Sequence, residues 1–370
     1  MDSSEGKLTI NILQWKGRGG MLIGACGYGA TGSSVVSDLL REYDEVQVYD
    51  KYEFWLSYRV DGLEDLEYHL MKQYSKGESC DAAINRFLRK SKSYMVPFIN
   101  KPCKGKKFYQ LSKQFINEIT QFEFKGLYTH EVCSGYVIKD VFAFASKKIF
   151  MPKIIEKIVG HRVYVWPCAI KRYSIEPENF YTAVHRYTSS VLEAMGADLS
   201  KPICLDQPFS GNNPECSMKF YKDAKAIVVD KDPRDLFLAG KYTKDPNFKF
   251  SPIDDVEKFI IYYKNMRRHY GESQDVLRIR FEDLIYNYDE SISKIENFLG
   301  IHNHIRRKEF FDPSRSINNT QLIRLHPEDE DNIKRIEKEL PQFLFDFRKY
   351  KEISFNGKPF DGAARKAFEQ

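Results

Sequence analysis

The stretch MLIGACGYGATGSSVVSDLLREYDEVQVYD, residues 21–50, constrains the fold more than any other part of the sequence. A short apolar run leads into closely spaced glycines, and the glycines lead into a segment whose apolar residues recur at helical spacing. A second short apolar run then ends at Asp50. This order predicts a strand, a glycine loop, a helix and a second strand. Such a unit implies a parallel sheet with helices on its faces.

The glycine loop of this unit has the composition of an anion-binding site. Gly27, Gly29 and Gly32 allow a tight turn whose N–H groups point inward, and the helix that follows adds the positive end of its dipole. A glycine-rich turn that only joins a strand to a helix explains the same spacing about as well. The loop also contains the hydroxyl donors Thr31, Ser33 and Ser34.

The rest of the chain continues the alternation of helices and strands. Short strands are predicted at residues 202–207, 224–230 and 276–284, each separated from the next by helical patterns. Residues 52–122 contain amphipathic helical patterns without a convincing strand, so they predict a helical insertion. Residues 123–175 contain the helix-like run MPKIIEKIVG and the strand-like run HRVYVW. The sequence pattern does not define how these elements are arranged in the fold.

We therefore expect one α/β domain with a P-loop-type parallel sheet flanked by helices. Residues 21–350 form this domain, and residues 52–122 are its helical insertion. Residues 1–20 precede the first strand-like run and are predicted to be an extension outside the fold. Residues 351–370 are predicted to be a C-terminal tail.

Two further motifs follow predicted strands and belong at the carboxyl edge of the sheet, where open α/β sheets bind ligands. Asp206 ends the strand PICLDQ, and a carboxylate there suits a general base, a Mg²⁺ ligand or a turn cap. Lys231 and Arg234, in the run KDPRD after the strand AKAIVVD, suit a second phosphate. Alone, the KDPRD run is also explained by a surface turn with a local Arg–Asp pair.

Composition narrows the class of protein. A net charge of +5 over 370 residues is too small for a typical nucleic-acid binder. The seven cysteines include no metal-spaced cluster and predict reduced thiols, so we expect a cytoplasmic protein without a metal. We find neither a membrane-spanning run nor the order of a signal peptide. The oligomeric state cannot be read from the sequence.

Taken in order, these motifs resemble the sulfotransferases that use 3′-phosphoadenosine 5′-phosphosulfate (PAPS). The segments VLRIRFEDL and SRSINNTQL look like further parts of that family's pattern, and GYGATGSS, DLEYHL and LDQ look like the sulfotransferase-like proteins of bacterial surface-polysaccharide gene clusters. The resemblance implies PAPS as donor, PAP as product and a saccharide or glycan hydroxyl as acceptor. It assigns the proton-accepting role to Asp206, the 5′-phosphosulfate to residues 29–34, and the 3′-phosphate to Lys231, Arg234 and Arg315.

The sequence departs from the family pattern at several of these positions. Ala30 stands where the loop usually has Lys or Arg, and Ala239 stands where a Ser is expected. Lys231 replaces an Arg, so a point charge takes the place of a bidentate group. Asp206 replaces the His that many members use as a base.

Two other functions stay open. A Mg²⁺-dependent nucleotide phosphotransferase would use Ser34 and Asp206 at the metal, although Ser33 stands where its lysine belongs. A nucleotide- or anion-binding protein without activity is consistent with Ala30 and Ala239.

The helical insertion is the predicted acceptor side of the cleft. Its aromatic residues either stack on sugar rings or pack its helices together, and the second explanation is the more common one. Its cationic side chains and the acid–base pair of the run YTHEV are further candidates for the site: Arg59, His69, Lys72, His130 and Glu131.

Overall fold

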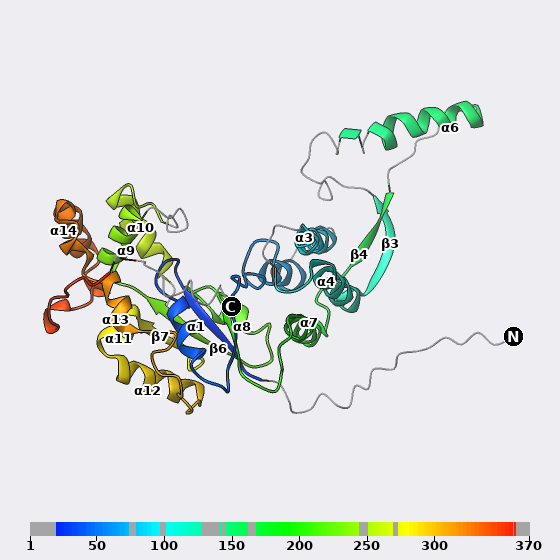
Figure 1. Cartoon of the computed structure of the whole chain (residues 1–370). Coiled ribbons are helices and arrows are strands. Elements are labelled where there is room, and N and C mark those ends of the chain that lie inside the picture. Colours follow the sequence, from blue (N-terminus) through cyan, green and yellow to red (C-terminus); the bar gives the residue numbers. More distant parts are fainter. Residues whose placement is uncertain are drawn as a thin grey trace.

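The central sheet confirms the predicted α/β fold class. In a computed structural model, five strands of the described residues form a parallel sheet in the order β2-β5-β1-β6-β7 (Figure 1). The strands are β1 (Leu22–Gly27), β2 (Gln47–Tyr49), β5 (Ile203–Asp206), β6 (Ala224–Asp230) and β7 (Val276–Arg280). The structure describes residues 20–73, 79–96, 101–127, 141–142, 145–161, 168–243, 251–268, 273–357 and 359.

The strand order brings three carboxyl ends together. β1 lies between β5 and β6, with Ala25 opposite Asp206 and Gly27 opposite Val229. The chain therefore leaves β1 toward β2 and β5 on one side, and later passes to β6 and β7 on the other. The crevice of an open α/β sheet forms where the strand order reverses in this way. The ends of β1, β5 and β6 consequently share one site.

Helices cover both faces of the sheet, because alternate residues of a strand point to opposite faces. On β1, Leu22 and Cys26 belong to one buried cluster, whereas Ile23 and Ala25 belong to another. Residues of α1, α11 and α12 complete the second cluster, and residues of α9, α10 and α14 form a third. The bounds are α1 (Ser34–Leu40), α8 (Glu215–Met218), α9 (Pro233–Tyr242), α10 (Val256–Met266), α11 (Phe281–Tyr286), α12 (Tyr288–Leu299), α13 (Pro313–Ser316) and α14 (Glu330–Glu339).

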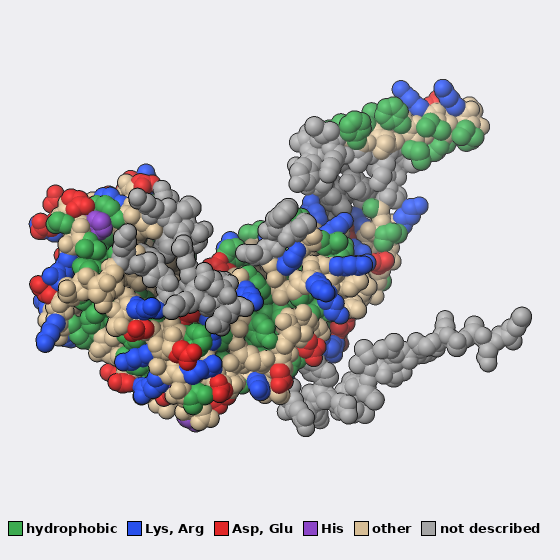
Figure 2. Space-filling model, viewed as in Figure 1, with side chains coloured by type: hydrophobic (Ala, Val, Ile, Leu, Met, Phe, Trp, Pro, Cys, Tyr) green, Lys and Arg blue, Asp and Glu red, His purple; other side chains and the backbone are tan. Residues whose placement is uncertain are grey.

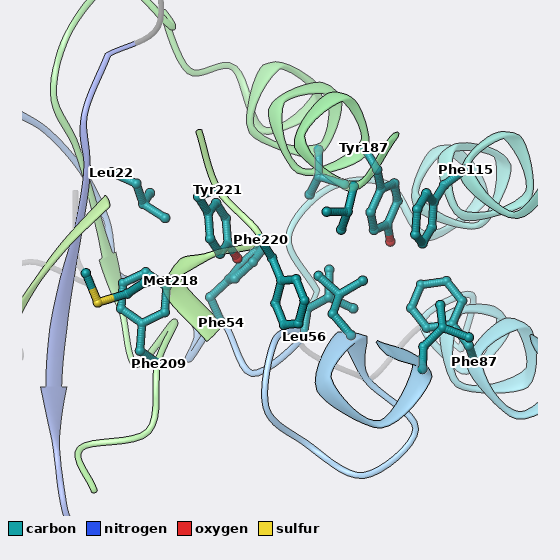
Figure 3. Close-up of a cluster of buried hydrophobic side chains, with 14 of the residues drawn as sticks. Leu22, Phe54, Leu56, Phe87, Phe115, Tyr187, Phe209, Met218, Phe220 and Tyr221 are labelled. Atoms are coloured by element: carbon teal, nitrogen blue, oxygen red, sulfur yellow. The ribbon is translucent and has the colours of Figure 1, made fainter. Parts of the chain in front are cut away.

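The predicted helical insertion is built largely from aromatic packing. Figure 3 shows a continuous buried cluster that runs from Leu22 of the sheet to Phe87, Phe115 and Tyr187 of the helices. The Phe115 and Tyr187 rings stack with their centroids 5.0 Å apart. In the described residues, many of the insertion's aromatics are thus core residues. Its elements, with the later helix that packs on them, are α2 (Leu63–Glu67), a π-helical turn η2 (Tyr68–Lys72), α3 (Ser79–Ser93), α4 (Gly105–Ile119) and α7 (Phe180–Met195).

Residues 123–175, which the sequence left unordered, include a two-stranded antiparallel ribbon. β3 (Phe122–Leu127) pairs with β4 (Cys168–Tyr173), and the Phe122 and Tyr173 rings stack across the pair at 4.5 Å. The helix predicted from MPKIIEKIVG is observed as α6 (Met151–Val159), which projects beyond the ribbon (Figure 1). Residues 162–166 of the strand-like run lie outside the described residues.

Most of the predicted N-terminal extension and part of the predicted C-terminal tail fall outside the described residues. Residues 1–19 and 360–370 are among those not described. The beginning of the predicted tail contacts the domain, because the Arg324 guanidinium donates to the Ile353 carbonyl and Asn318 exchanges hydrogen bonds with Asn356. No helix within the described ranges is both long and apolar enough to cross a bilayer.

Candidate active site

A cavity of about 470 Å³ lies at the carboxyl ends of β1, β5 and β6, a volume within the usual range for small-molecule sites. Most of the sequence-predicted site residues meet there. They are Gly27, Gly29, Ala30, Gly32, Ser33, Ser34, Asp206 and Lys231.

The glycine loop after β1 follows an unusual backbone path. Gly29, Ala30 and Gly32 have φ angles of 86°, 54° and 92°. Residues with a Cβ rarely adopt positive φ angles, whereas glycine does so readily. A Cβ at Gly32 would come within 2.5 Å of the Phe281 ring, so both its φ angle and its packing require glycine. Ala30 carries the same strain without this contact. The loop therefore curves around the cavity in a conformation that the glycine spacing anticipated.

The side chain of Gln207 holds this loop in place. Its Oε1 accepts a hydrogen bond from the Gly27 N–H at 3.2 Å, and its Nε2 donates to the Ser33 Oγ at 2.8 Å. Thr31 adds an internal tie, because its buried Oγ1 accepts from the Tyr28 N–H at 3.1 Å. Thr31 thus supports the loop from within, rather than facing the ligand as the sequence analysis expected. Sequence reasoning gave Gln207 no function beyond ending a strand.

Asp206 lies beside the loop in an environment that disfavours its charge. Its Oδ1 is buried and has no hydrogen-bond partner among the described residues. Burial, followed by the nearby carboxylates of Glu53, Asp50 and Asp38, raises the pKa of Asp206 to about 8. Glu53 lines the same cavity, and burial raises the pKa of this carboxyl as well. A carboxyl that titrates near neutral pH suits a general base or acid.

Lys231 is the residue of the KDPRD motif that reaches the cavity. It is buried, and its Nζ lies 4.8 Å from the centroid of the Phe281 ring. Burial lowers the pKa of Lys231, whereas the carboxylates of Asp235, Glu282 and Asp232 oppose that shift. Lys231 and Phe281 both line the cavity, so the Lys231 ammonium lies at the cavity wall, and its role as a phosphate ligand stays a prediction.

Arg234 lies outside the cavity lining. Its guanidinium pairs with both oxygens of Asp232, with Glu337 at 2.8 Å, and with the Phe345 carbonyl. These contacts attach the start of α9 to the C-terminal region. The prediction that Arg234 binds the 3′-phosphate does not fit this arrangement, because four hydrogen bonds already occupy the side chain.

The structure places the remaining predicted residues in different positions. Ala239 is buried in the cluster formed by α9, α10 and α14 and does not line the cavity. The Ser that the resemblance leads us to expect at this position would therefore not line the cavity either. Arg315 is exposed and is not itself part of the lining, but the next residue, Ser316, is. His69 and Lys72 pair with Asp65 and Glu67 and do not line the cavity. His130 and Glu131 lie outside the described residues.

One wall of the cavity comes from residues 51–62, a segment after β2 that includes the start of the predicted insertion, whereas the helices of the insertion do not line the cavity. This segment contributes Glu53, Trp55, Tyr58 and Arg59. The Arg59 guanidinium lies 3.6 Å from the centroid of the Trp55 ring, a cation–π contact at the cavity wall. Sequence reasoning named only Arg59 among these residues. The position of the segment immediately after a strand of the sheet was the signal that could have identified the others.

Comparisons with solved structures identify sulfotransferases at low identity. The sulfotransferase domain of the Synechococcus olefin synthase has 13% identity and a TM-score of 0.32, over 96% of this chain and 97% of that chain. A sulfotransferase from Mycobacterium avium has 10% identity and a TM-score of 0.34, over 92% and 79%. Retinol dehydratase, solved with androsterone and the inactive cofactor PAP, has 12% identity and a TM-score of 0.32, over 90% and 82%.

No protein-family model matches the sequence, and the search of curated proteins gives no match. All of the TM-scores quoted lie below 0.5. We therefore base the proposed function on the residues of the cavity.

The two hydrogen bonds of the Gln207 side chain to the glycine loop predict what a substitution of Gln207 does. Gln207→Leu loses both loop hydrogen bonds, so we expect the free energy of unfolding to fall by about 1–3 kcal/mol, and ligand affinity at the loop to fall as well. Gln121→Leu is a matched control, since Gln121 also makes two side-chain hydrogen bonds with backbone, to Ile175. Urea denaturation and calorimetric titration with PAP measure the two effects. An equal loss of PAP affinity in both variants would contradict the conclusion that Gln207 holds the loop in place.

The raised pKa of Asp206 predicts a pH-dependent stability. An Asp with the ordinary value of 3.8 ionises in the unfolded chain well before Asp206 ionises in the native state at about 8. Between these values the native state binds more protons, so this group lowers the unfolding free energy as the pH rises. We expect Asp206→Asn to exceed the wild type in stability by a margin that grows across this window. Urea denaturation at several pH values measures it, with the exposed Asp254→Asn as control. A margin independent of pH would contradict the assignment.

Proposed function

We propose that this protein transfers a sulfuryl group from PAPS to a hydroxyl of a saccharide or glycan precursor. The observation that carries the proposal is the meeting of three features in one cavity. These are a glycine loop with positive φ angles, the ammonium group of Lys231, and the carboxyl group of Asp206 with its raised pKa. The sequence predicted this combination from three separate motifs.

The residues present fit a nucleotide with phosphate groups at two positions. The backbone N–H groups of residues 29–34 would hold the 5′-phosphosulfate, and Lys231 would neutralise the 3′-phosphate. Arg315 can join from the rim, because the neighbouring Ser316 lines the cavity. Bound PAPS supplies the sulfuryl group and a stable leaving group.

The place of Asp206 in the cavity wall and its raised pKa support a role as base for the acceptor hydroxyl. In the proposed reaction the hydroxyl proton passes to the Asp206 carboxylate while the oxygen bonds to sulfur, and the bridging bond to the 5′-phosphate breaks. The products are a sulfate ester and PAP. Alignment and charge stabilisation account for most of the catalysis in such a transfer. Retention of the full transfer rate by Asp206→Asn would contradict this role.

Arg59 is a candidate for the cation that the loop does not have, because Ala30 stands where Lys or Arg is usual. It lines the same cavity as Ala30, it is exposed, and its contact with the Trp55 ring fixes the direction of the guanidinium. Its charge also opposes the upward pKa shift of Glu53. We propose that Arg59 stabilises the charge that develops on the departing phosphate.

A Mg²⁺-dependent phosphotransferase is the second candidate, and one observation favours it. Glu53, Asp206 and Ser34 all line the cavity, and Mg²⁺ is commonly bound by one or two carboxylates together with substrate phosphates. In the described part of the chain, no group of three or more His, Cys, Asp or Glu side chains is arranged to hold a metal ion. A Mg²⁺ ion at this position would therefore depend on oxygens of a nucleotide.

A ligand screen by thermal shift distinguishes these functions. PAP and PAPS are expected to raise the melting temperature equally with and without Mg²⁺, whereas ATP and GTP are not. At a concentration about 100-fold above Kd, a ligand adds roughly 2.7 kcal/mol of stability. Stabilisation only by ATP or GTP with Mg²⁺ would support the phosphotransferase. Stabilisation by PAP without transfer to any glycan tested would support a binding protein, and no response to any ligand contradicts both enzymes.

The proposed role of Arg59 predicts a rescue. Arg59→Ala is expected to lower the transfer rate by roughly 100-fold, the usual cost of losing one charge-stabilising donor. Ala30→Lys in the same chain restores a cation at the loop and should recover part of that rate. Release of PAP from PAPS in the presence of acceptor measures the rate. Lys72→Ala is the matched control, because Lys72 lies in the helical insertion but not in the cavity lining.

Two outcomes contradict this role. One is a normal rate in Arg59→Ala. The other is an Ala30→Lys substitution that raises the transfer rate by the same factor in the Arg59→Ala variant as in the wild type.

A further inference from the structure

The helix α6 projects from the end of the β3–β4 ribbon, away from the sheet (Figure 1). It continues directly from the π-helical turn η4 (Ser146–Phe150), and Gly160 ends it with a φ angle of 77°. No residue of α6 is buried. A projecting helix of this kind lacks the tertiary packing that normally stabilises helices in proteins.

One side of this helix is an exposed apolar face. Phe150, Met151, Ile154, Ile155, Ile158 and Val159 fall on one half of the helix at the usual 3.6-residue period. Phe150 is 61% exposed, Ile154 53% and Ile158 78%. Figure 2 shows these apolar side chains grouped along the projecting helix. Contiguous exposed apolar surface on a soluble domain marks a site of interaction.

The polar half of α6 has a small net positive charge. Lys153 and Lys157 lie there, both exposed, with Glu156 as the acidic residue of the same helix. Lys153 and Lys157 flank the apolar face along one edge, because they are one helical turn apart. The helix therefore combines an apolar half with a net positive polar half, which is the pattern of helices that lie in the interface of an anionic membrane.

We propose that α6 docks this protein on the surface of an anionic lipid bilayer. The apolar face enters the boundary between headgroups and acyl chains, while Lys153 and Lys157 contact anionic headgroups. α6 lies away from the central sheet, beyond the ribbon (Figure 1). This proposal is independent of the proposed sulfuryl transfer.

A second copy of the chain fits this face less well. The helical residues 146–159 span about 21 Å, so one face of the helix is much smaller than the roughly 800 Å² per partner of a stable protein interface. A symmetric contact would also bring the lysines of two copies close together. A membrane satisfies both the small apolar area and the positive charge.

Vesicle sedimentation of the full-length protein tests the proposal. We expect binding to vesicles of phosphatidylcholine with phosphatidylglycerol, and little binding to phosphatidylcholine alone. Lys153→Gln/Lys157→Gln should lower the partition coefficient by roughly 25-fold, about fivefold for each lysine. Ile154→Asp/Ile158→Asp should abolish binding. The control is Lys334→Gln/Lys338→Gln on α14, where two exposed lysines are removed from a helix elsewhere.

Three results would overturn the proposal. The first is equal binding of the wild type to both kinds of vesicle, and the second is equal loss in the α14 control. The third is a wild-type oligomer, seen by size-exclusion chromatography with light scattering, that Ile154→Asp/Ile158→Asp converts to monomer without any change in vesicle binding. That result would assign the apolar face to a second copy. PAP binding, measured on the same variants, reports whether the fold and the cavity stay intact.

Discussion

The candidate site depends on one side chain that links two neighbouring strands of the sheet. Gln207 follows β5, and its amide bonds to the beginning and to the end of the glycine loop that follows β1. This link is possible only because β1 and β5 are parallel neighbours, so that their carboxyl ends lie at the same height. The loop path, with its positive φ angles, is thereby coupled to the strand that carries Asp206. A displacement of either strand would separate the glycine loop from the proposed base.

Electrostatics then divide the cavity into two parts. Lys231 approaches the loop from β6, whereas the carboxyls of Asp206 and Glu53 lie toward β5 and the segment after β2. Burial raises the pKa of both carboxyls, and the Glu53 carboxylate adds to the shift at Asp206, which favours a proton-transfer role over a salt bridge. Arg59 stands on the carboxyl side and is the one cationic side chain that residues 51–62 contribute to the described lining.

Sequence patterns predicted the features that depend on local order. The strand–loop–helix unit, the strands around Asp206 and Lys231, and the sheet itself follow from short-range periodicity and glycine spacing. The contacts of individual side chains could not be predicted from the sequence, because they depend on residues that are far away along the chain. Arg234 bonds to Glu337 and Phe345, more than 100 positions later, and no local pattern reveals such contacts. The ribbon of β3 and β4 was missed for the same reason, since about 40 residues separate its paired strands.

The central claim is that one cavity holds a nucleotide with its two phosphate positions at the loop and at Lys231. A crystal structure of the complex with PAP tests it most directly. The account predicts the 5′-phosphate within hydrogen-bonding distance of the backbone N–H groups of residues 29–34, and the 3′-phosphate beside the Lys231 ammonium. A nucleotide bound with its phosphates away from the loop, or bound at another site, would contradict it.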